Sequence, residues 1–234
     1  MRITPLGDTA LRIEVGEHID EATHRRVQTA FLALEAAALA GVTELTPAYT
    51  TVTLFYDPVR VVEAGAPLSD LVAWLVTRVR DVLARASKSE KIKGRTIEIP
   101  VCYGGDLGPD LAAVAALAKI SSEEVIKRHS RADYLVYLVG FAPGFAYLGG
   151  LPKELATPRR STPRTQVPAG SLAIGGAQTG IYPLASPGGW NLIGRTSLRM
   201  FRPEENPPVL LRTGDHVKFR AIPRAEFDAM EARV

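Results

Sequence analysis

The 234-residue sequence has little of what marks secreted, disulfide-bonded or membrane-spanning proteins. It holds one cysteine, Cys102, which excludes an internal disulfide and is typical of a protein in a reducing cytoplasm. No apolar run approaches the ~20 residues that a membrane-spanning helix needs. The first residues, MRITPLGDTALRIEV, contain no uninterrupted apolar segment, so we expect no secretory signal. The sequence therefore predicts a cytoplasmic protein with no membrane partner.

Signatures of metal, nucleotide, biotin and nucleic-acid binding are also missing. The segment from Gly175 to Gly180 continues with Ile181, where a phosphate-binding Walker A motif needs lysine and then serine or threonine. No Met-Lys-Met sequence for biotin attachment is present, and a net charge of +3 with interleaved signs provides no stripe for nucleic acid. We expect no metal site, because no metal-ligand spacing occurs at His18, His24, His129 or His216.

The N-terminal part alternates between strand and helix patterns. Apolar periodicity predicts strand, helix, strand, strand and helix, in that order, over residues 10–15, 20–40, 42–46, 51–56 and 69–86. Asp20 and Ser69 are candidate N-terminal caps, and Gly41 is a candidate C-terminal cap of the first helix. With one more strand this order is the ferredoxin-like split βαβ arrangement. The polar segment SKSEKIKGR, residues 87–95, predicts a domain boundary, which we place between residues 88 and 89.

The rest of the chain is rich in short strand patterns separated by glycine and proline turns. Candidate strands cover residues 97–101, 134–139, 171–174, 181–183 and 190–194, and we expect a closing hairpin from residues 209–211 and 217–222. Ser121 with Glu124 matches a helix capping box between the first two of these strands. Many short strands with such turns are typical of a barrel or a sandwich.

The most informative segment runs from residue 140 to residue 196. These 57 residues hold 11 of the 20 glycines and 7 of the 17 prolines, together with five basic side chains and one acidic side chain. A disordered linker would be poor in aromatic and β-branched residues, whereas this segment contains many of both. We therefore interpret it as an ordered, turn-rich surface with an excess of arginine, which suits a site for an anion.

Three arginines, Arg159, Arg160 and Arg164, form the centre of that candidate site. A guanidinium can bind a carboxylate or a phosphate through two hydrogen bonds, but a solvated basic loop is the alternative explanation. Arg195 is a further candidate, and it could equally be a surface charge at a strand end. The loop of residues 175–180 could bind an oxyanion through its backbone amides, or it could be a hairpin turn.

Other side chains of the segment could line the same pocket. Trp190 is expected in the core or in a pocket wall, and the hydroxyl group of Ser186 lies close to it in the sequence. Tyr147 and Tyr182 could each offer a phenol to a ligand. Alternatively, each could be buried in a core with its hydroxyl group hydrogen-bonded to the backbone. His129 is expected to cap the C-terminus of a helix, and a general base is the alternative.

The same segment resembles a known family. VYLVGFAPGFAYLGGLP, TPRRSTPRTQVPAGSLAIGGAQTGIYP and SPGGWNLIGRT together are similar to the KipI/PxpB family, also called the allophanate hydrolase subunit 1 family. The resemblance extends through VCYGGDLGPDL and LLRTGDHVKF and so covers nearly the whole chain. It implies an α+β protein with a small N-terminal ferredoxin-like α/β domain, residues 1–88, followed by a cyclophilin-like β-barrel domain, residues 89–234.

The resemblance implies three alternative activities. PxpB-type members form one subunit of an ATP-dependent 5-oxoprolinase, which converts 5-oxoproline to L-glutamate together with A-type and C-type subunits on separate chains. KipI-type members inhibit autophosphorylation of a sensor histidine kinase. Related domains form part of the carboxyltransferase unit of urea carboxylase-type enzymes, which would need a biotin carrier elsewhere. We favour the 5-oxoprolinase role, inactive alone, with ATP bound with or by partner subunits and any C-type half on a separate polypeptide.

The implied substrate fits the arginine-rich segment. 5-Oxoproline carries a carboxylate and a stable lactam, and guanidinium groups and backbone amides would hold its carboxylate and the phosphoryl oxygens. The expected substrate-binding residues are Arg159, Arg160, Arg164, Gln178, Tyr182 and Arg195. The expected pocket wall consists of Phe145, Tyr147, Ser186 and Trp190. The resemblance does not identify a catalytic base in this chain.

Overall fold

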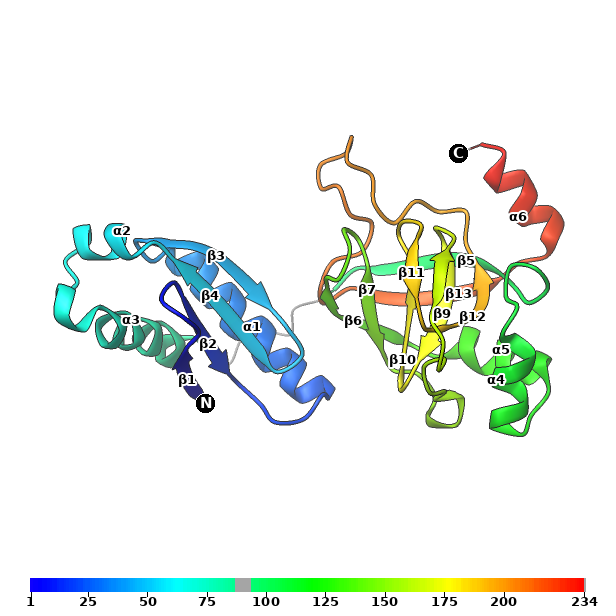
Figure 1. Cartoon of the computed structure of the whole chain (residues 1–234), viewed down its shortest axis with the longest axis horizontal. Helices are drawn as coiled ribbons and strands as arrows, with labels where there is room; N and C mark the ends of the chain where they lie inside the picture. Colours follow the sequence, from blue (N-terminus) through cyan, green and yellow to red (C-terminus); the bar gives the residue numbers. More distant parts are fainter. Residues whose placement is uncertain (87–93, 234) are drawn as a thin grey trace. The chain divides into compact units, whose positions relative to one another are not determined.

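A computed structural model describes residues 1–86 and 94–233 of the chain (Figure 1). The chain folds as two compact units, Met1–Ile92 and Lys93–Val234. The boundary expected between residues 88 and 89 lies outside the described residues and stays a prediction. No helix in the described ranges combines the length and the apolar character needed to cross a membrane. The result is a mixed α/β chain with a sheet unit and a barrel unit.

The sheet unit contains a four-stranded antiparallel sheet in the order β1-β2-β4-β3. Its strands are β1 (Arg2–Pro5), β2 (Ala10–Glu14), β3 (Val42–Pro47) and β4 (Thr51–Tyr56). Its helices are α1 (Glu21–Ala37), α2 (Pro58–Glu63), the 3-10 turn η1 (Leu68–Asp70) and α3 (Leu71–Arg85). The fourth strand is β1, which precedes the expected elements. The ferredoxin-like class of this unit stays a prediction.

The helix caps of the sheet unit agree only in part with the sequence. Asp20 caps α1 as expected, because its side chain accepts a hydrogen bond of 2.7 Å from the backbone N–H of Thr23. Gly41 is not the C-terminal cap: Ala38 takes the left-handed conformation there, at φ 42°. Ser69 is also not the cap of α3, since it lies inside η1 and Asp70 occupies the cap position.

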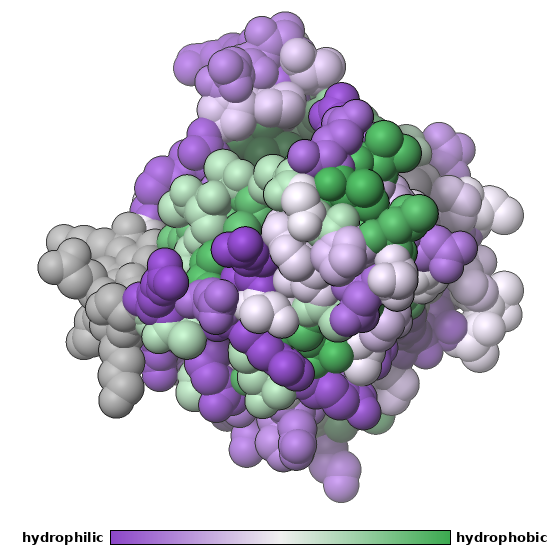
Figure 2. All heavy atoms as spheres, turned by 90° about the vertical axis from the view of Figure 1, so that its left-hand side faces the viewer, coloured by the Kyte–Doolittle hydropathy of each residue, from purple (hydrophilic) through white to green (hydrophobic). Residues whose placement is uncertain are grey.

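The core of the sheet unit follows from the alternation along its strands. Residues that alternate with polar ones on β2 and β4 are fully buried and pack against the apolar faces of α1 and α3. This core includes Leu11, Ile13, Val27, Leu34, Val52, Leu54, Leu75 and Val79. On the face turned to the viewer in Figure 2, hydrophilic side chains are interspersed with hydrophobic ones. Leu68 and Val59 are among the exposed apolar residues of this unit.

The barrel unit is a closed seven-stranded barrel in the order β10-β7-β6-β13-β5-β12-β9. Its strands are β5 (Thr96–Tyr103), β6 (Tyr134–Val139), β7 (Ala146–Gly149), β9 (Ser171–Gly175), β10 (Gln178–Ile181), β12 (Asn191–Arg195) and β13 (His216–Ala221). A separate two-stranded ribbon is formed by β8 (Arg164–Val167) and β11 (Ser186–Gly188). The helices are α4 (Leu111–Ala118), α5 (Ser122–Arg131), the 3-10 turn η2 (Lys153–Leu155) and α6 (Arg224–Glu231). The expected barrel is thus confirmed.

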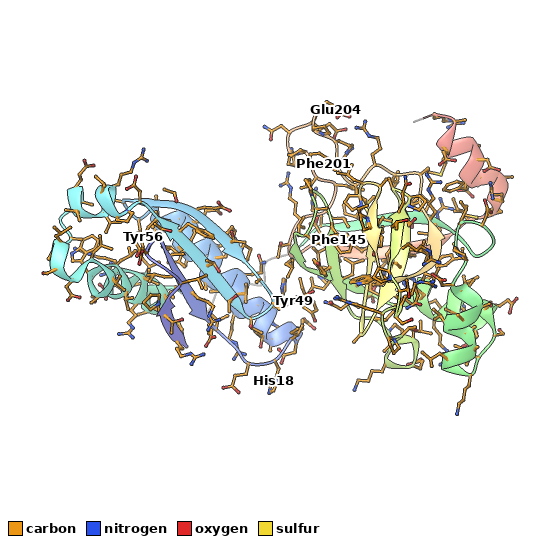
Figure 3. All side chains as sticks on the ribbon, viewed as in Figure 1. His18, Tyr49, Tyr56, Phe145, Phe201 and Glu204 are labelled. Carbon is orange, nitrogen blue, oxygen red and sulfur yellow. The ribbon has the colours of Figure 1, made fainter. Side chains whose placement is uncertain are left out.

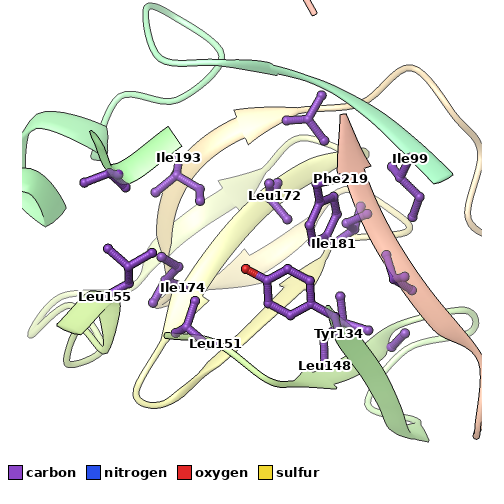
Figure 4. Packing of buried hydrophobic residues seen from close by; sticks show 14 of the residues in the cluster. Ile99, Tyr134, Leu148, Leu151, Leu155, Leu172, Ile174, Ile181, Ile193 and Phe219 are labelled. Carbon is purple, nitrogen blue, oxygen red and sulfur yellow. The ribbon is translucent and has the colours of Figure 1, made fainter. Parts of the chain in front are cut away.

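The barrel interior is filled by one face of each strand (Figure 4). On β9, Leu172 and Ile174 point inward, whereas Ala173 between them belongs to a second cluster on the outside. The ring of Tyr134 lies among these inward side chains (Figure 4), and its hydroxyl group donates a 2.9 Å hydrogen bond to the backbone oxygen of His129. Alternation therefore gives this part of the barrel two apolar faces, an interior and an outer patch.

The prediction of a hairpin near the C-terminus is wrong. The second segment does form β13, but β13 pairs in parallel with β5 and antiparallel with β6. Val209 makes an isolated bridge to Phe201 instead, on the long segment between β12 and β13 where Figure 3 labels Phe201 and Glu204. Both edges of β13 are therefore occupied by barrel strands and are not available to residues 209–211. Sequence periodicity identified the strand but not its neighbours.

Candidate functional site

An aromatic cluster lies on the outside of the barrel, where the β8–β11 ribbon covers β9 and β12. Phe145 (labelled in Figure 3) is at its centre and is 2% exposed. Its ring meets three other rings edge to face, at centroid distances of 4.8 Å to Tyr147, 5.4 Å to Tyr182 and 5.6 Å to Trp190. Such edge-to-face contacts are the preferred geometry of aromatic pairs. The cluster is therefore a packed and ordered wall.

Glycines allow these rings to approach the backbone. A Cβ atom on Gly175 would lie 2.4 Å from the indole of Trp190, and one on Gly188 would lie 2.3 Å from the hydroxyl oxygen of Tyr182. Both distances are shorter than a Cβ contact allows, so an alanine at either position would force the neighbouring ring to move. The high glycine content of this segment thus reflects close packing against aromatic side chains, in addition to its turns.

A pocket of about 310 Å³ opens beside the aromatic cluster. One wall is aromatic, and Arg159 and Arg160 form another wall. Phe141 also lines the pocket; it is 70% exposed and has a left-handed backbone conformation at φ 72°, which is rare for an aromatic residue. Its ring contacts Phe145 edge to face at 5.5 Å. The pocket therefore combines an apolar surface with positive charge, the chemistry that suits a small organic anion.

The arginine segment, residues 157–164, is fixed to the barrel at several points. Thr157 exchanges two backbone hydrogen bonds with Gly176, of 3.1 and 2.7 Å. The side chain of Asn191 donates a 2.9 Å bond to the carbonyl oxygen of Pro158, and the backbone N–H of Arg160 donates a 2.8 Å bond to the carbonyl oxygen of Gly189. The backbone on both sides of Arg159 is thus held in place, although its side chain is exposed.

A buried carboxylate, Asp110, lies at the N-terminus of α4 and binds two of the three arginines. Both nitrogens of the Arg164 fork donate to it at 2.8 Å, and Arg160 donates at 3.1 Å. The backbone N–H of Leu192 donates a further bond of 2.7 Å. Burial acts to raise the pKa of Asp110, but the hydrogen bonds and charges of these partners outweigh it and lower the pKa below its ordinary value.

Burial and the charge of Arg159 also shift the pKa values of the two pocket tyrosines. Burial raises the pKa of Tyr147 and the pKa of Tyr182 above the ordinary value, while the nearby charge of Arg159 acts in the opposite direction on both. Both phenols therefore keep their protons at neutral pH. They can donate hydrogen bonds, but they are not bases.

The structure brings together six of the ten residues expected at the site. The pocket is lined by Arg159, Arg160, Phe145, Tyr147, Tyr182 and Trp190. Arg164 reaches the same region only through Asp110. Ser186 pairs with Val167 in the ribbon, and Gln178 begins β10; neither is part of the lining. The assignment of these residues to substrate stays a prediction.

Arg195 lies at a different cavity, of about 470 Å³, on the side of the barrel that α6 covers. Its guanidinium donates a 2.9 Å bond to the carbonyl oxygen of Ala169 and pairs with Glu231 at 3.2 Å. It also lies over the ring of Phe227, 5.9 Å from the centroid. These contacts attach Arg195 to the C-terminal helix and separate it from the arginine segment.

Two further candidates have structural roles. The loop of residues 175–180 contains the turn between β9 and β10, and the backbone N–H of Gly176 is taken by Thr157. His129 lies in the last turn of α5, but its ring is fully buried against Tyr103 and Thr179 and does not cap the helix end; desolvation lowers its pKa to about 3. A histidine enclosed in this way has no access to a ligand in the pocket, which argues against the general-base alternative.

Sequence reasoning missed Asp110 and Phe141. Asp110 follows Pro109 at the start of a helix, a position where an acidic residue is ordinarily an exposed cap, and nothing nearby in the sequence indicates its distant partners. Phe141 lies in the motif GFAPGF, where a glycine on each side signals a tight turn but not which residue adopts the left-handed conformation.

In the described part of the barrel unit, no group of three or more potential ligands could hold a metal ion.

Comparisons with known proteins match nearly the whole length of the chain. A family model described as carboxyltransferase domain, subdomain C and D, matches residues 1–211. The B-type subunit of the 5-oxoprolinase of Bacillus subtilis (strain 168) is 45% identical over 229 residues, which cover 97% of this chain and 95% of that protein. The corresponding 5-oxoprolinase chain of Escherichia coli O157:H7 is 42% identical over 221 residues, with 94% and 95% covered.

A solved structure is similar over both units. The crystal structure of TTHA0988 has a TM-score of 0.77 and 36% identity to this chain, with 92% of this chain and 40% of that chain covered. The present chain therefore corresponds to less than half the length of that longer protein.

Proposed function

This chain belongs to the family of the carboxyltransferase domain, subdomain C and D, and we propose that within it the chain serves as the B-type subunit of a 5-oxoprolinase. The observation that carries the proposal is the pair of relatives of that name, which are 45% and 42% identical over nearly the whole chain. Their naming as subunits implies other chains in the complex. We propose that these are A-type and C-type subunits on separate polypeptides and that this chain has no turnover alone.

The pocket supports a role in holding the substrate. 5-Oxoproline has one carboxylate and a flat five-membered ring, which match a guanidinium beside an aromatic wall. We propose that Arg159 binds the carboxylate, with Arg160 next to it, and that the ring lies against Phe145 and Trp190. Charge-assisted hydrogen bonds to a fork of this kind are among the stronger ones available to a protein. Tyr147 and Tyr182 would donate hydrogen bonds to the same ligand.

The reaction needs activation of a stable amide. The lactam oxygen attacks the terminal phosphorus of ATP and ADP leaves. Water then adds to the ring carbon, and the ring C–N bond breaks as the nitrogen is protonated, which gives an acyl phosphate. A second water hydrolyses the acyl phosphate to the carboxylate of L-glutamate and phosphate. Protein groups assist such a step by fixing the substrate and by stabilising the developing charge. We propose that this chain supplies the fixing of the substrate and that partner subunits bind ATP and supply the catalytic base. The complex is proposed to work in the cytoplasm.

We propose that the N-terminal domain spans residues 1–88 and that its sheet and helices are of the ferredoxin-like class. Antiparallel pairing of β1 with β2 supports this, because β1 then fills the edge position of the missing last strand. We propose that the second domain spans residues 89–234 and that its barrel is of the cyclophilin-like class, on the resemblance of its sequence motifs.

A carboxyltransferase role is the second candidate, and the description of the matching family model favours it. Such a reaction would require a biotin carrier on another chain. The two roles differ in their dependence on biotin, so an avidin block distinguishes them: it abolishes carboxyl transfer and leaves lactam hydrolysis intact.

The deciding experiment is reconstitution of this chain with its candidate A-type and C-type partner chains. We expect 5-oxoproline-dependent ATP hydrolysis and release of L-glutamate from the mixture, and neither from this chain alone or from the partners without it. Turnover by the partners alone at the full rate would overturn the proposal. A stoichiometric complex with a sensor histidine kinase, together with no turnover in any mixture, would instead support the inhibitor function of KipI-type members.

A further inference from the structure

The carboxylate of Asp110 controls the charge of the arginine segment. We propose that Asp110 is a positioning residue: it neutralises Arg164, holds Arg160 in part, and leaves Arg159 as the guanidinium that receives the carboxylate of the substrate. This inference rests on the proposed function, because it concerns the pocket in which we place 5-oxoproline.

The hydrogen-bonding capacity of Asp110 is fully used. Its Oδ1 atom accepts from Arg164 at 2.8 Å and from Arg160 at 3.1 Å, and its Oδ2 atom accepts from Arg164 at 2.8 Å and from the Leu192 N–H at 2.7 Å. An ionised carboxylate offers about four acceptor positions, and all of them are taken. With a side chain only 8% exposed, Asp110 cannot act as a base in the pocket. It acts on the ligand only through the arginines.

The three arginines are consequently unequal. Arg164 gives its fork to Asp110 and begins β8, so it is part of the scaffold. Arg160 gives one nitrogen to Asp110, and its other nitrogens can face the pocket that it lines. Arg159 forms no ion pair with any carboxylate of residues 1–86 or 94–233. Among the three, Arg159 therefore keeps its full charge available for a ligand.

The arrangement also lowers the cost of binding. The arginine segment is tied by Pro158 to Asn191, by Arg160 to Gly189, and by Asp110 to both α4 and β12. A guanidinium whose backbone is fixed in advance loses less conformational entropy when it binds an anion than one on a free loop. Loss of Asp110 would release two guanidinium groups that could then fold over the pocket or pair with the ligand of Arg159 in the wrong geometry.

The test is Asp110→Asn in the reconstituted complex, because asparagine has nearly the same shape but no charge. We expect the KM for 5-oxoproline to rise about tenfold, with kcat changed less than threefold and the KM for ATP unchanged. Asp215→Asn is the matched control. Asp215 is also buried in the barrel unit, also takes an arginine fork, from Arg95, and also accepts a backbone N–H, from Arg212, but it lies outside the pocket.

Each outcome decides the inference. A higher KM for 5-oxoproline in Asp110→Asn but not in Asp215→Asn supports it, and equal KM values in the two variants overturn it, since both then report only stability. Should Asp110→Asn fail to fold, Arg164→Lys is the alternative variant, because lysine keeps the charge but loses the fork. Its control is Arg95→Lys. An unchanged KM for 5-oxoproline in Arg164→Lys contradicts the inference. Absence of turnover in the wild-type complex would contradict the proposed function instead.

Discussion

The Nδ1 atom of His129 lies 2.9 Å from the hydroxyl oxygen of Tyr103 inside the barrel. On its other side, Nε2 lies 3.0 Å from the hydroxyl of Thr179, which donates its own proton to the carbonyl oxygen of Ala173. Thr179 must therefore accept from Nε2, and Nδ1 must accept from Tyr103. One neutral tautomer satisfies every partner, and a second proton on the ring would leave the Tyr103 hydroxyl facing a donor.

This arrangement predicts a loss of stability in mild acid. Desolvation lowers the folded-state pKa of His129 to about 3, whereas an unfolded histidine has a pKa of about 6.5. Between these values the unfolded state binds more protons, so stability falls as the pH falls below 6.5. We expect the barrel unit to lose roughly 2.5 kcal/mol between pH 7 and pH 4.5. Denaturant unfolding in a Trp74→Phe background, followed by the fluorescence of Trp190, measures this.

The control for that measurement is His129→Gln. Glutamine can donate and accept one hydrogen bond each but does not titrate, so the variant should be less stable at pH 7 and should lose most of the pH dependence over this range. His216→Gln, at an exposed position of β13, should retain it. An equal pH dependence in the wild type and in His129→Gln would show that other groups are responsible.

The neighbouring glycines Gly188 and Gly189 provide a matched pair at the pocket. A Cβ atom at position 188 would lie 2.3 Å from the Tyr182 hydroxyl oxygen, but at position 189 the nearest atom is 3.6 Å away, on Pro163. We expect Gly188→Ala to displace Tyr182 and cost about 1–3 kcal/mol of stability, as overpacking does. Gly189→Ala should cost less than about 0.5 kcal/mol. Thermal unfolding of the two variants compares them, and equal melting temperatures would contradict this account of the segment's glycines.

Local signals in the sequence predicted elements more reliably than partners. The strand β6 was predicted over residues 134–139 from a continuous apolar run of strand length, although only Tyr134 and Val136 of it are buried. The Ser121 cap of α5 is confirmed by its bond of 3.2 Å from the Glu124 N–H. The pairing of β13 with β5 joins residues more than a hundred positions apart, and no local pattern encodes it. Local patterns therefore left a barrel and a sandwich open, the family resemblance implied the barrel, and neither predicted the strand order.

The candidate site shows the same limit. The glycine, proline and aromatic content correctly indicated an ordered surface, and two of its arginines do line a pocket. The charge balance of that pocket depends on Asp110, which is fifty residues away from Arg160 in the sequence. A count of basic residues within the segment could not include it. Similarly, Arg195 lies in the same segment but pairs with Glu231 of α6, because it ends β12, whereas Trp190 of the pocket precedes the start of that strand.

The C-terminus of α4 offers a stabilising substitution. Lys119 ends this helix in the left-handed conformation at φ 56°, which costs a non-glycine residue roughly 1 kcal/mol. We expect Lys119→Gly to stabilise the barrel unit by about 0.5–1 kcal/mol. Lys127→Gly, in the interior of the adjacent helix α5, should destabilise it by about 1 kcal/mol. Denaturant unfolding gives both values, and a loss of stability in Lys119→Gly would show that its side chain has a role of its own.

Arg159 and Arg195 were both expected to bind substrate, Arg159 in the central cluster and Arg195 as a further candidate, and the structure leads to opposite predictions for them. Arg159→Ala removes a guanidinium that lines the pocket, and a hydrogen bond to a charged group contributes about 1.5–3 kcal/mol. In the reconstituted complex this corresponds to a rise in the KM for 5-oxoproline of about 10- to 100-fold, with Arg159→Lys intermediate because it keeps the charge but not the fork. Arg195→Ala loses its contacts to Ala169 and Glu231 instead, so it should lower the melting temperature by a few degrees and change the KM less than twofold. Steady-state kinetics at saturating ATP decides between them. An unchanged KM in Arg159→Ala, or a larger increase in Arg195→Ala, would mean that the anion binds elsewhere and that the aromatic pocket has another ligand.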